Sequence, residues 1–276
     1  MVALACELPA TQGLPLSRFS LQDLIDQAEE MGLIAPLSRT TLWRWLTEQA
    51  VQPWRHRSWI HVRDPQFEAK AAIVLDLYEG LFEGQPLGPD DFVLCADEKP
   101  RIQARERLHP PVSACPHRPV RVEHDYLRHG SLAFVAALDV QRGTVIGRTE
   151  PSTGIAPFMR LVHQVMQRRP YRRARRVFWI VDNASSHRPD TFPDRLRQSY
   201  PQARAVHLPV HASWLNQIEL CFSILQRKVL TPPHFPGLTR LAHALLDFIR
   251  RYNRTAQPFQ WTFTRAKLSE RMNALA

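Results

Sequence analysis

Three acidic residues, Asp97, Asp182 and Glu219, occupy positions from which carboxylates could act together. Asp97 follows the apolar run 92–96 and Asp182 follows the apolar run 177–181, so each would end a buried strand. Glu219 lies beside the apolar stripe of a helix expected further along the chain. Carboxylates that converge repel one another and stay ionised only when cations lie among them. Because carboxylate oxygens are hard ligands, the pattern favours Mg²⁺ or Mn²⁺ over zinc, and two such ions can assist phosphoryl transfer.

The order of strands and helices predicts how these acids are brought together. Strands are expected over 91–98, 131–140, 143–150, 175–182 and 203–209. Helices are expected over 154–169, 189–201, 213–230 and 238–253. Antiparallel strands followed by strand–helix alternation predict an α/β fold, a ribonuclease H-like mixed five-stranded sheet with helices on both faces. In that order the first and fourth strands are parallel neighbours, so Asp97 and Asp182 would meet at their carboxyl ends.

Each of these acids also has a simpler explanation. An aspartate after a strand commonly forms a turn, and only the combination of three acids at successive element ends favours a site. Asn183 and His187, which follow Asp182, could orient water or a phosphate or could cap the turn. Asn216 is expected one helical turn before Glu219, where it could support that carboxylate.

The first 62 residues predict a small all-α region. Ser20 and Ser38 are expected to cap two helices joined by a short turn, and Leu42, Trp45, Leu46 and Gln49 would lie on one side of the second. This pattern suits a partial helix-turn-helix in which the second helix enters a DNA major groove, although a plain helical hairpin fits it equally. Its candidate DNA-binding residues are Arg39, Thr41 and Arg44.

Two boundaries divide the rest of the chain. Asp64 and Pro65 are expected to open a linker helix within residues 63–89. The glycines and prolines near residue 88 would end that region. Residues 90–276 then form the predicted catalytic domain.

The charge of the chain predicts a polyanionic partner. Lys and Arg number 36 against 26 Asp and Glu, which gives a formal net charge of +10. Arg55 and Arg57 alternate with tryptophans, as in segments that follow a phosphate backbone. Arg172 and Arg173 belong to the stretch 168–176, which holds six arginines and could contact DNA or form a solvated loop.

Neither a signal peptide nor a membrane span is evident in the sequence. The N-terminus lacks a basic start with a long apolar stretch, and no window reaches the ~18 uncharged apolar residues that a span needs. None of the four cysteines forms a C-x-x-C pair, which fits a reducing compartment. We expect a soluble, cytoplasmic protein that associates with the nucleoid when it binds DNA.

Five longer motifs are spread along the chain: "CADEKPRIQARERLHP" (95–110), "EHDYLRHGS" (123–131), "VDNASSHRP" (181–189), "LPVHASWLNQIELCFSILQRKVL" (208–230) and "YNRTAQPFQWTFT" (252–264). Together they resemble the DDE transposases of the bacterial insertion-sequence branch of the mariner-like superfamily. The resemblance implies that Asp97, Asp182 and Glu219 are the catalytic triad and bind two Mg²⁺ or Mn²⁺ ions. It also implies cut-and-paste transposition: cleavage of double-stranded DNA at element ends, then attack of the freed 3′-hydroxyl on a TA-containing target. A homodimer is expected because the reaction joins two ends.

The chain departs from this family at its N-terminus. Members usually carry two helix-turn-helix units, whereas about 20 residues precede the first clear helix here, so the first unit is expected to be missing. An inactive or truncated DNA-binding protein, acting as a repressor, is therefore the alternative to an active transposase. A hydrolytic nuclease without strand transfer is a third hypothesis.

Overall fold

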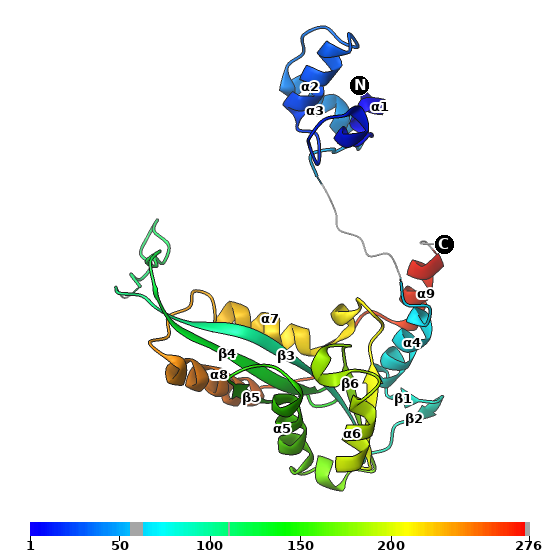
Figure 1. The fold of residues 1–276 in the computed structure, drawn as a ribbon, viewed down its shortest axis with the longest axis vertical. Helices are drawn as coiled ribbons and strands as arrows, with labels where there is room; N and C mark the ends of the chain where they lie inside the picture. The colour runs from blue at the N-terminus through cyan, green and yellow to red at the C-terminus, as the bar shows by residue number, and fades with distance from the viewer. Residues whose placement is uncertain (56–62, 110, 274–276) are drawn as a thin grey trace. The chain divides into compact units, whose positions relative to one another are not determined.

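A mixed five-stranded β-sheet forms the centre of the larger part of the chain (Figure 1). The computed structural model describes residues 1–55, 63–109 and 111–273, and the chain divides into two units, Met1–His61 and Val62–Ala276. The described part of the first unit contains helices and no strand. None of the described helices is both long and apolar enough to cross a membrane.

The first unit is a set of short helices. Its elements are α1 (Val2–Ala5), the 3₁₀ turn η1 (Pro9–Gln12), α2 (Leu21–Glu30) and α3 (Arg39–Glu48). The Oγ of Ser20 accepts a hydrogen bond from the backbone N–H of Asp23 at 3.1 Å, and the Asp23 carboxylate accepts one from the Ser20 N–H at 2.8 Å. The Oγ of Ser38 accepts from the Thr41 N–H at 3.2 Å. Both predicted caps are therefore confirmed, because each satisfies a helix N–H that would otherwise have no acceptor.

The small core of this unit is built from α2 and α3. Leu24, Ile25, Leu42 and Leu46 are buried in it. Trp45, which was expected on the same side of α3 as Leu42 and Leu46, is not part of this core, because its side chain is 46% exposed. Leu42 and Leu46 are one turn apart and fill the contact with α2, which leaves Trp45 on the flank of the helix.

The sheet has the strand order β5-β4-β3-β6-β7. Its strands are β3 (Asp91–Glu106), β4 (Leu127–Asp139), β5 (Val145–Glu150), β6 (Arg176–Val181) and β7 (Ala203–His207). β4 pairs antiparallel with β3 and β5, whereas β6 pairs parallel with β3 and β7. The first and fourth predicted strands are thus parallel neighbours, as expected. Figure 1 shows β3 and β4 running side by side and projecting past the other strands.

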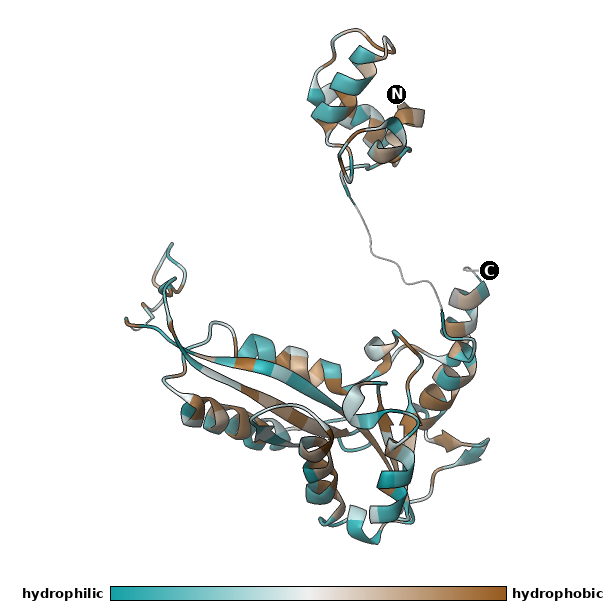
Figure 2. Cartoon of the chain, viewed as in Figure 1, coloured by the Kyte–Doolittle hydropathy of each residue, from teal (hydrophilic) through white to brown (hydrophobic). Residues whose placement is uncertain are grey.

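Helices cover both faces of the sheet. One apolar core contains side chains from α4 (Phe67–Tyr78), α7 (Ile218–Lys228) and α8 (Leu238–Asn253), and the other contains side chains from α5 (Ile155–Met166) and α6 (Phe192–Ser199). Val93 and Cys95 face the first core, whereas Leu94 and Ala96 face the second, as the two-residue period of a strand requires. Figure 2 shows the resulting apolar centre of the sheet in brown.

Smaller elements complete the second unit. α9 (Arg265–Asn273) packs against α4. The two-residue strands β1 (Leu81–Phe82) and β2 (Gln85–Pro86) follow α4 in the chain and form a hairpin. The 3₁₀ turns are η2 (Tyr171–Arg173), η3 (Ser185–His187) and η4 (Ser213–Leu215).

The start of α4 differs from the prediction. The helix begins at Phe67, after Gln66, and Asp64 does not cap it as expected. The buried Asp64 carboxylate instead accepts backbone N–H bonds from Gln66 at 2.9 Å and from Val210 at 3.1 Å, and it pairs with Lys70 at 2.9 Å. A contact with Val210, distant in sequence, therefore displaces the local cap that the sequence pattern indicates.

A buried ion cluster fixes the amino-terminal ends of β3 and β6. The fully buried carboxylate of Asp91 accepts bonds from the guanidinium groups of Arg176, at 2.8 Å, and of Arg175, and from the Gly88 N–H at 2.9 Å. The Arg176 guanidinium, assisted by Arg175, holds the pKa of Asp91 well below its usual range although burial opposes this. The cluster therefore stabilises the fold while the carboxylate is ionised.

We expect Asp91→Asn to lower the free energy of unfolding at pH 7 by roughly 1–3 kcal/mol, because a hydrogen-bonded charge is removed from between two arginines. A depressed folded-state pKa stabilises the protein above the ordinary aspartate pKa, and that contribution is lost as the pH falls. The difference between variant and wild type should therefore shrink below pH ~4. Urea unfolding across pH measures it, with Asp90→Asn, an exposed neighbour, as the control. An equal effect of both substitutions would contradict the assignment.

Candidate active site

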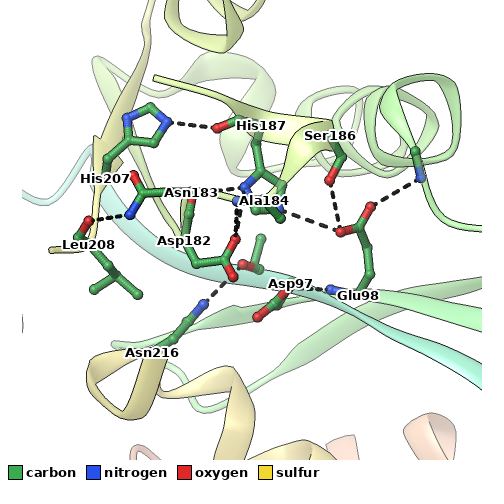
Figure 3. A network of polar contacts seen from close by, with 12 residues as sticks. Asp97, Glu98, Asp182, Asn183, Ala184, Ser186, His187, His207, Leu208 and Asn216 are labelled. Carbon is green, nitrogen blue, oxygen red and sulfur yellow. Dashed lines mark hydrogen bonds and ion pairs between the residues drawn. The ribbon is translucent and has the colours of Figure 1, made fainter. Parts of the chain in front are cut away.

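Asp97 and Asp182 lie next to one another where the pairing of β3 with β6 ends: Asp182 directly follows β6, and Asp97 lies within β3, two residues past its last pair with β6. The parallel register pairs Cys95 with Ile180, and each acid comes two residues after its member of that pair. Since side chains alternate along a strand, both carboxylates project from the face that carries Cys95 and Ile180. Figure 3 shows the two acids at this edge. The prediction that Asp97 ends its strand is wrong, because β3 continues past it through an irregularity in the ladder to Glu106.

Glu219 reaches the same edge from the first turn of α7. Burial, together with the charges of Asp182 and Glu219, raises the pKa of Asp97 to about 7, although the Glu98 N–H bond and the charge of His187 lower it. Burial also raises the pKa of Glu219, with Asp182 adding to the shift and Lys99 opposing it. Each predicted acid is therefore within electrostatic reach of another, and their mutual repulsion penalises the fully ionised state.

His187 links Asp182 to a fourth acid, Glu98. The imidazole is completely buried, and its Nδ1 lies 2.9 Å from the Asp182 carbonyl oxygen and 3.2 Å from Oδ1 of the same residue. Its Nε2 lies 3.5 Å from Oε2 of Glu98, and its ring centroid is 4.7 Å from that of Phe158. Burial disfavours the imidazolium, but these contacts with Glu98 and Asp182 raise the pKa of His187 overall. His187 thus holds the segment that follows β6 in place.

Glu98 is a site residue that the sequence prediction missed. Its carboxylate accepts a bond from the Ser186 hydroxyl at 2.9 Å and from the Gly154 N–H, at the start of α5, at 3.4 Å. Within the described part of the chain, ligand atoms of Asp97, Glu98 and His187 form a group whose members lie within 4.8 Å of one another. Two consecutive acids at a strand end are the only signal for this group in the sequence.

Asn216 and Asn183 make structural contacts around the acids (Figure 3). The Asn216 side chain donates to the Ala96 carbonyl oxygen at 3.1 Å, and the Asn183 side chain donates to that of Leu208 at 2.9 Å. The first bond ties the segment before α7 to β3, and the second ties the end of β6 to the end of β7. Neither donated bond involves an acid of the predicted triad.

The helix that carries Glu219 begins later than predicted. The expected helix 213–230 is divided into η4 and α7, and Asn216 between them has extended backbone angles, φ −78° and ψ 109°. Asn216 is therefore not on the helix one turn before Glu219, although its carbonyl oxygen accepts the Glu219 N–H at 3.1 Å. Asparagine side chains commonly bond backbone groups outside the helix and interrupt it in this way.

The donor groups of the predicted triad are of the chemical kind that binds a divalent cation, although the close group of ligand atoms found among the described residues contains Asp97 but neither Asp182 nor Glu219. Carboxylate oxygens of Asp97, Asp182 and Glu219 are hard ligands, and their repulsion would be relieved by a positive ion. The buried Oδ1 of Asn216 has no hydrogen-bond partner among the described residues, so a further oxygen is available. These features suit Mg²⁺ or Mn²⁺ better than a softer metal.

The candidate DNA-binding residues are divided between the two units. Arg39 and Arg44 are exposed on α3, whereas Thr41 is half-buried and its hydroxyl lies 2.9 Å from that of Ser38. Arg172 and Arg173 are exposed in η2, before the amino-terminal end of β6. The last two candidates are Arg55, which is exposed, and Arg57, which lies outside the described residues.

The fold is shared with solved transposase complexes. The Mos1 mariner paired-end complex with Mn matches at 16% identity and TM-score 0.53, over 94% of this chain and 78% of that chain. The Mos1 strand transfer complex matches at 16% and 0.54, over 95% and 78%, and a pre-cleavage Mos1 transpososome at 14% and 0.52, over 95% and 79%. At these identities the likeness establishes the ribonuclease H-like fold alone. No curated protein matched the sequence.

The family is established by a match to the sequence itself. The model of the DDE superfamily endonucleases matches residues 92–241, which is more than half of the chain. The matched segment begins in β3 and extends into α8, so it includes the strand ends and the helix that carry the acids. The chain therefore belongs to the DDE superfamily endonucleases.

Proposed function

We propose that this protein is a transposase of the bacterial insertion-sequence branch of the mariner-like superfamily. It would cleave DNA at the ends of a mobile element and join the freed ends to a target. The observation that carries this proposal is the position of Asp97 and Asp182 directly after the parallel pairing of β3 with β6, with Glu219 on the neighbouring helix. The shared fold with Mos1 paired-end and strand transfer complexes supports it.

We assign Asp97, Asp182 and Glu219 as the ligands of Mg²⁺ or Mn²⁺, with two ions per site. When bound, the ions supply positive charge beside the reacting phosphate and so favour phosphodiester cleavage and strand transfer. The Asp182 side chain is 30% exposed whereas Asp97 is buried, so DNA would approach from the side of Asp182. His187 and Asn216 act as positioning residues, since one holds the segment after β6 and the other holds the start of α7.

The remaining assignments follow from the same proposal. Residues 1–62 would be a partial helix-turn-helix that contacts double-stranded DNA through Arg39, Thr41 and Arg44, residues 63–89 a linker region, and 90–276 the catalytic domain. Arg55, Arg57, Arg172 and Arg173 would add phosphate contacts, which suits the net charge of +10. Because two element ends must be joined, the active form would be a homodimer. It would be located in the cytoplasm and would associate with the nucleoid when bound to DNA.

A plasmid that carries the gene with its flanking DNA tests this function. With Mg²⁺ or Mn²⁺, the purified protein should cut at the element boundaries and join the ends to a second plasmid. Asp97→Asn, Asp182→Asn and Glu219→Gln should each lower the cleavage rate by at least about a hundredfold, as losses of charge-stabilising groups do. Asp190→Asn, which neutralises an exposed acid, should leave the rate unchanged.

The outcomes separate the competing functions. Binding of the ends without any nick by the wild-type protein would indicate a DNA-binding protein or repressor. Cleavage without joining would indicate a hydrolytic nuclease. Equal cleavage by the wild-type protein and the three variants would show that the assigned acids are wrong.

Repulsion at the acids also predicts how stability depends on pH and metal. A folded-state pKa raised to about 7 destabilises the ion-free protein above the ordinary aspartate pKa, with the full penalty above pH 7. Asp97→Asn should therefore raise the free energy of unfolding without metal by roughly 1–3 kcal/mol at pH 8, and by little near pH 4. Mg²⁺ should raise the melting temperature of the wild type and have a much smaller effect on Asp97→Asn. A destabilised Asp97→Asn with an undiminished Mg²⁺ response would contradict this account.

A further inference from the structure

A groove of about 380 Å³ lies beside the acids and is lined by basic side chains. On one side it is formed by residues 99–105 of β3, which include Lys99, Arg101 and Arg105, and on the other by Gln226 of α7 and the segment after that helix. Lys99 also lowers the pKa of Glu219, which places the start of the groove within electrostatic reach of the predicted triad. The residues that line it include no carboxylate among those the structure describes.

A β-bulge shapes this part of β3. Lys99 pairs with Phe134 and Ile102 pairs with Leu132, so β3 has one more residue than β4 between these pairs. Arg101, inside the bulge, has a φ of 51°, in the left-handed region that a residue with a side chain seldom adopts. Bulges near active sites commonly redirect side chains, and a strained arginine at such a point is retained only where the surroundings hold it.

The bulge changes which side chains face the core. Before it, the odd-numbered Val93 and Cys95 lie in the core beneath α7, whereas after it the even-numbered Ile102 and Ala104 lie there. The extra residue therefore moves the apolar side chains of the outer strand into the core and turns Arg101, Gln103 and Arg105 away from it. The outward position of Arg101 and Arg105 is therefore a consequence of this shift in register.

One edge of β3 is also left without a neighbouring strand here. Pairing with β6 ends at Cys95, so no described strand continues along that edge. The two ends of the open edge are held by other groups: Asn216 donates to the Ala96 carbonyl oxygen, and the Phe235 N–H donates to that of Arg105 at 2.6 Å. From residue 99 to residue 105 the strand extends about 20 Å, which is long enough for several units of a linear polymer.

The cations of the groove are free to bind an anion. Within the described ranges, Lys99 and Arg101 form no ion pair with a carboxylate. The Arg105 guanidinium donates to Oε1 of Gln103 at 2.9 Å and lies 4.6 Å from the ring centroid of Tyr126, so it is oriented but not neutralised. Oriented, unpaired guanidinium groups are well suited to phosphate oxygens.

We propose that this groove binds the phosphodiester backbone of the DNA strand that enters the acid site, with Arg101 and Arg105 contacting its phosphates. The inference rests on the proposed function, because it requires DNA as the substrate. It adds a binding surface formed by the bulge of β3, separate from α3 and from the arginines of η2. These residues contribute to affinity and to the path of the strand, not to the chemical step.

Binding of a short labelled DNA by the full-length protein, measured in EDTA over a range of salt concentrations, tests this proposal. The slope of log K against log salt should become shallower by about 0.9 for each duplex phosphate that the protein no longer neutralises, and by slightly less on a single strand. The slope is measured on duplex and on single-stranded DNA. On at least one of them, the double variant Arg101→Gln/Arg105→Gln should neutralise about two fewer phosphates than the wild type. Arg197→Gln/Arg204→Gln removes two exposed positive charges elsewhere and should keep the wild-type slope.

A second variant separates charge from folding. Glycine adopts the left-handed backbone of position 101 without strain, so the melting temperature of Arg101→Gly should equal or exceed that of the wild type. The same variant should neutralise about one phosphate fewer than the wild type. The proposal that the groove binds DNA would be contradicted by an unchanged slope of the double variant on both duplex and single-stranded DNA. An equal change in the control variant would contradict it as well. Asp97→Asn should keep the wild-type slope in EDTA. A failure of cleavage with this salt effect intact would therefore count against the proposed function and not against the groove.

Discussion

Electrostatic repulsion between Asp97 and Asp182 is the constraint on which the rest of the site depends. Asp182 directly follows β6, and Asp97 lies beside it within β3, on the face covered by α7. Burial contributes most to the cost of ionising Asp97, and the charge of Asp182 adds to it. A protein keeps such an arrangement only when apolar burial elsewhere outweighs it. Here the paired segments of β3 and β6 lie between two apolar cores, so the register that places the acids side by side is strongly specified.

The surrounding contacts hold the acids from several directions. At the opposite ends of the same two strands, Asp91 with its two arginines fixes the register before the acids are reached. Near the acids, His187 contacts both Asp182 and Glu98, and Asn216 attaches the start of α7 to β3. These contacts restrict the side chains around the acids. The carboxylates are therefore held in position before a metal ion binds. Asp97, Glu98 and the basic side chains of the groove belong to one continuous strand, β3, whose register changes at the bulge.

The sequence was sufficient for the order of the strands in the sheet and for the end of β6, but not for the carboxyl end of β3. Apolar runs of the length of a strand, each ended by an acid, predict where Asp97 and Asp182 lie because parallel neighbours share one edge. Other features depend on contacts between residues far apart in the chain. The helix before Glu219 is interrupted because Asn216 bonds to Ala96, and Glu98 gains its role from Ser186, 88 residues away. The extension of β3 to Glu106 required a bulge, which no local pattern indicated.

Location of a bound Mn²⁺ ion by anomalous X-ray scattering, from crystals of the full-length protein grown with MnCl₂, tests the central claim most directly. The account predicts manganese within ligand distance of Asp97, Asp182 and Glu219, with the scattering abolished in Asp97→Asn. Manganese held instead by Asp97, Glu98 and His187, or bound with Glu219 turned away, would contradict the assignment of the three acids as one site.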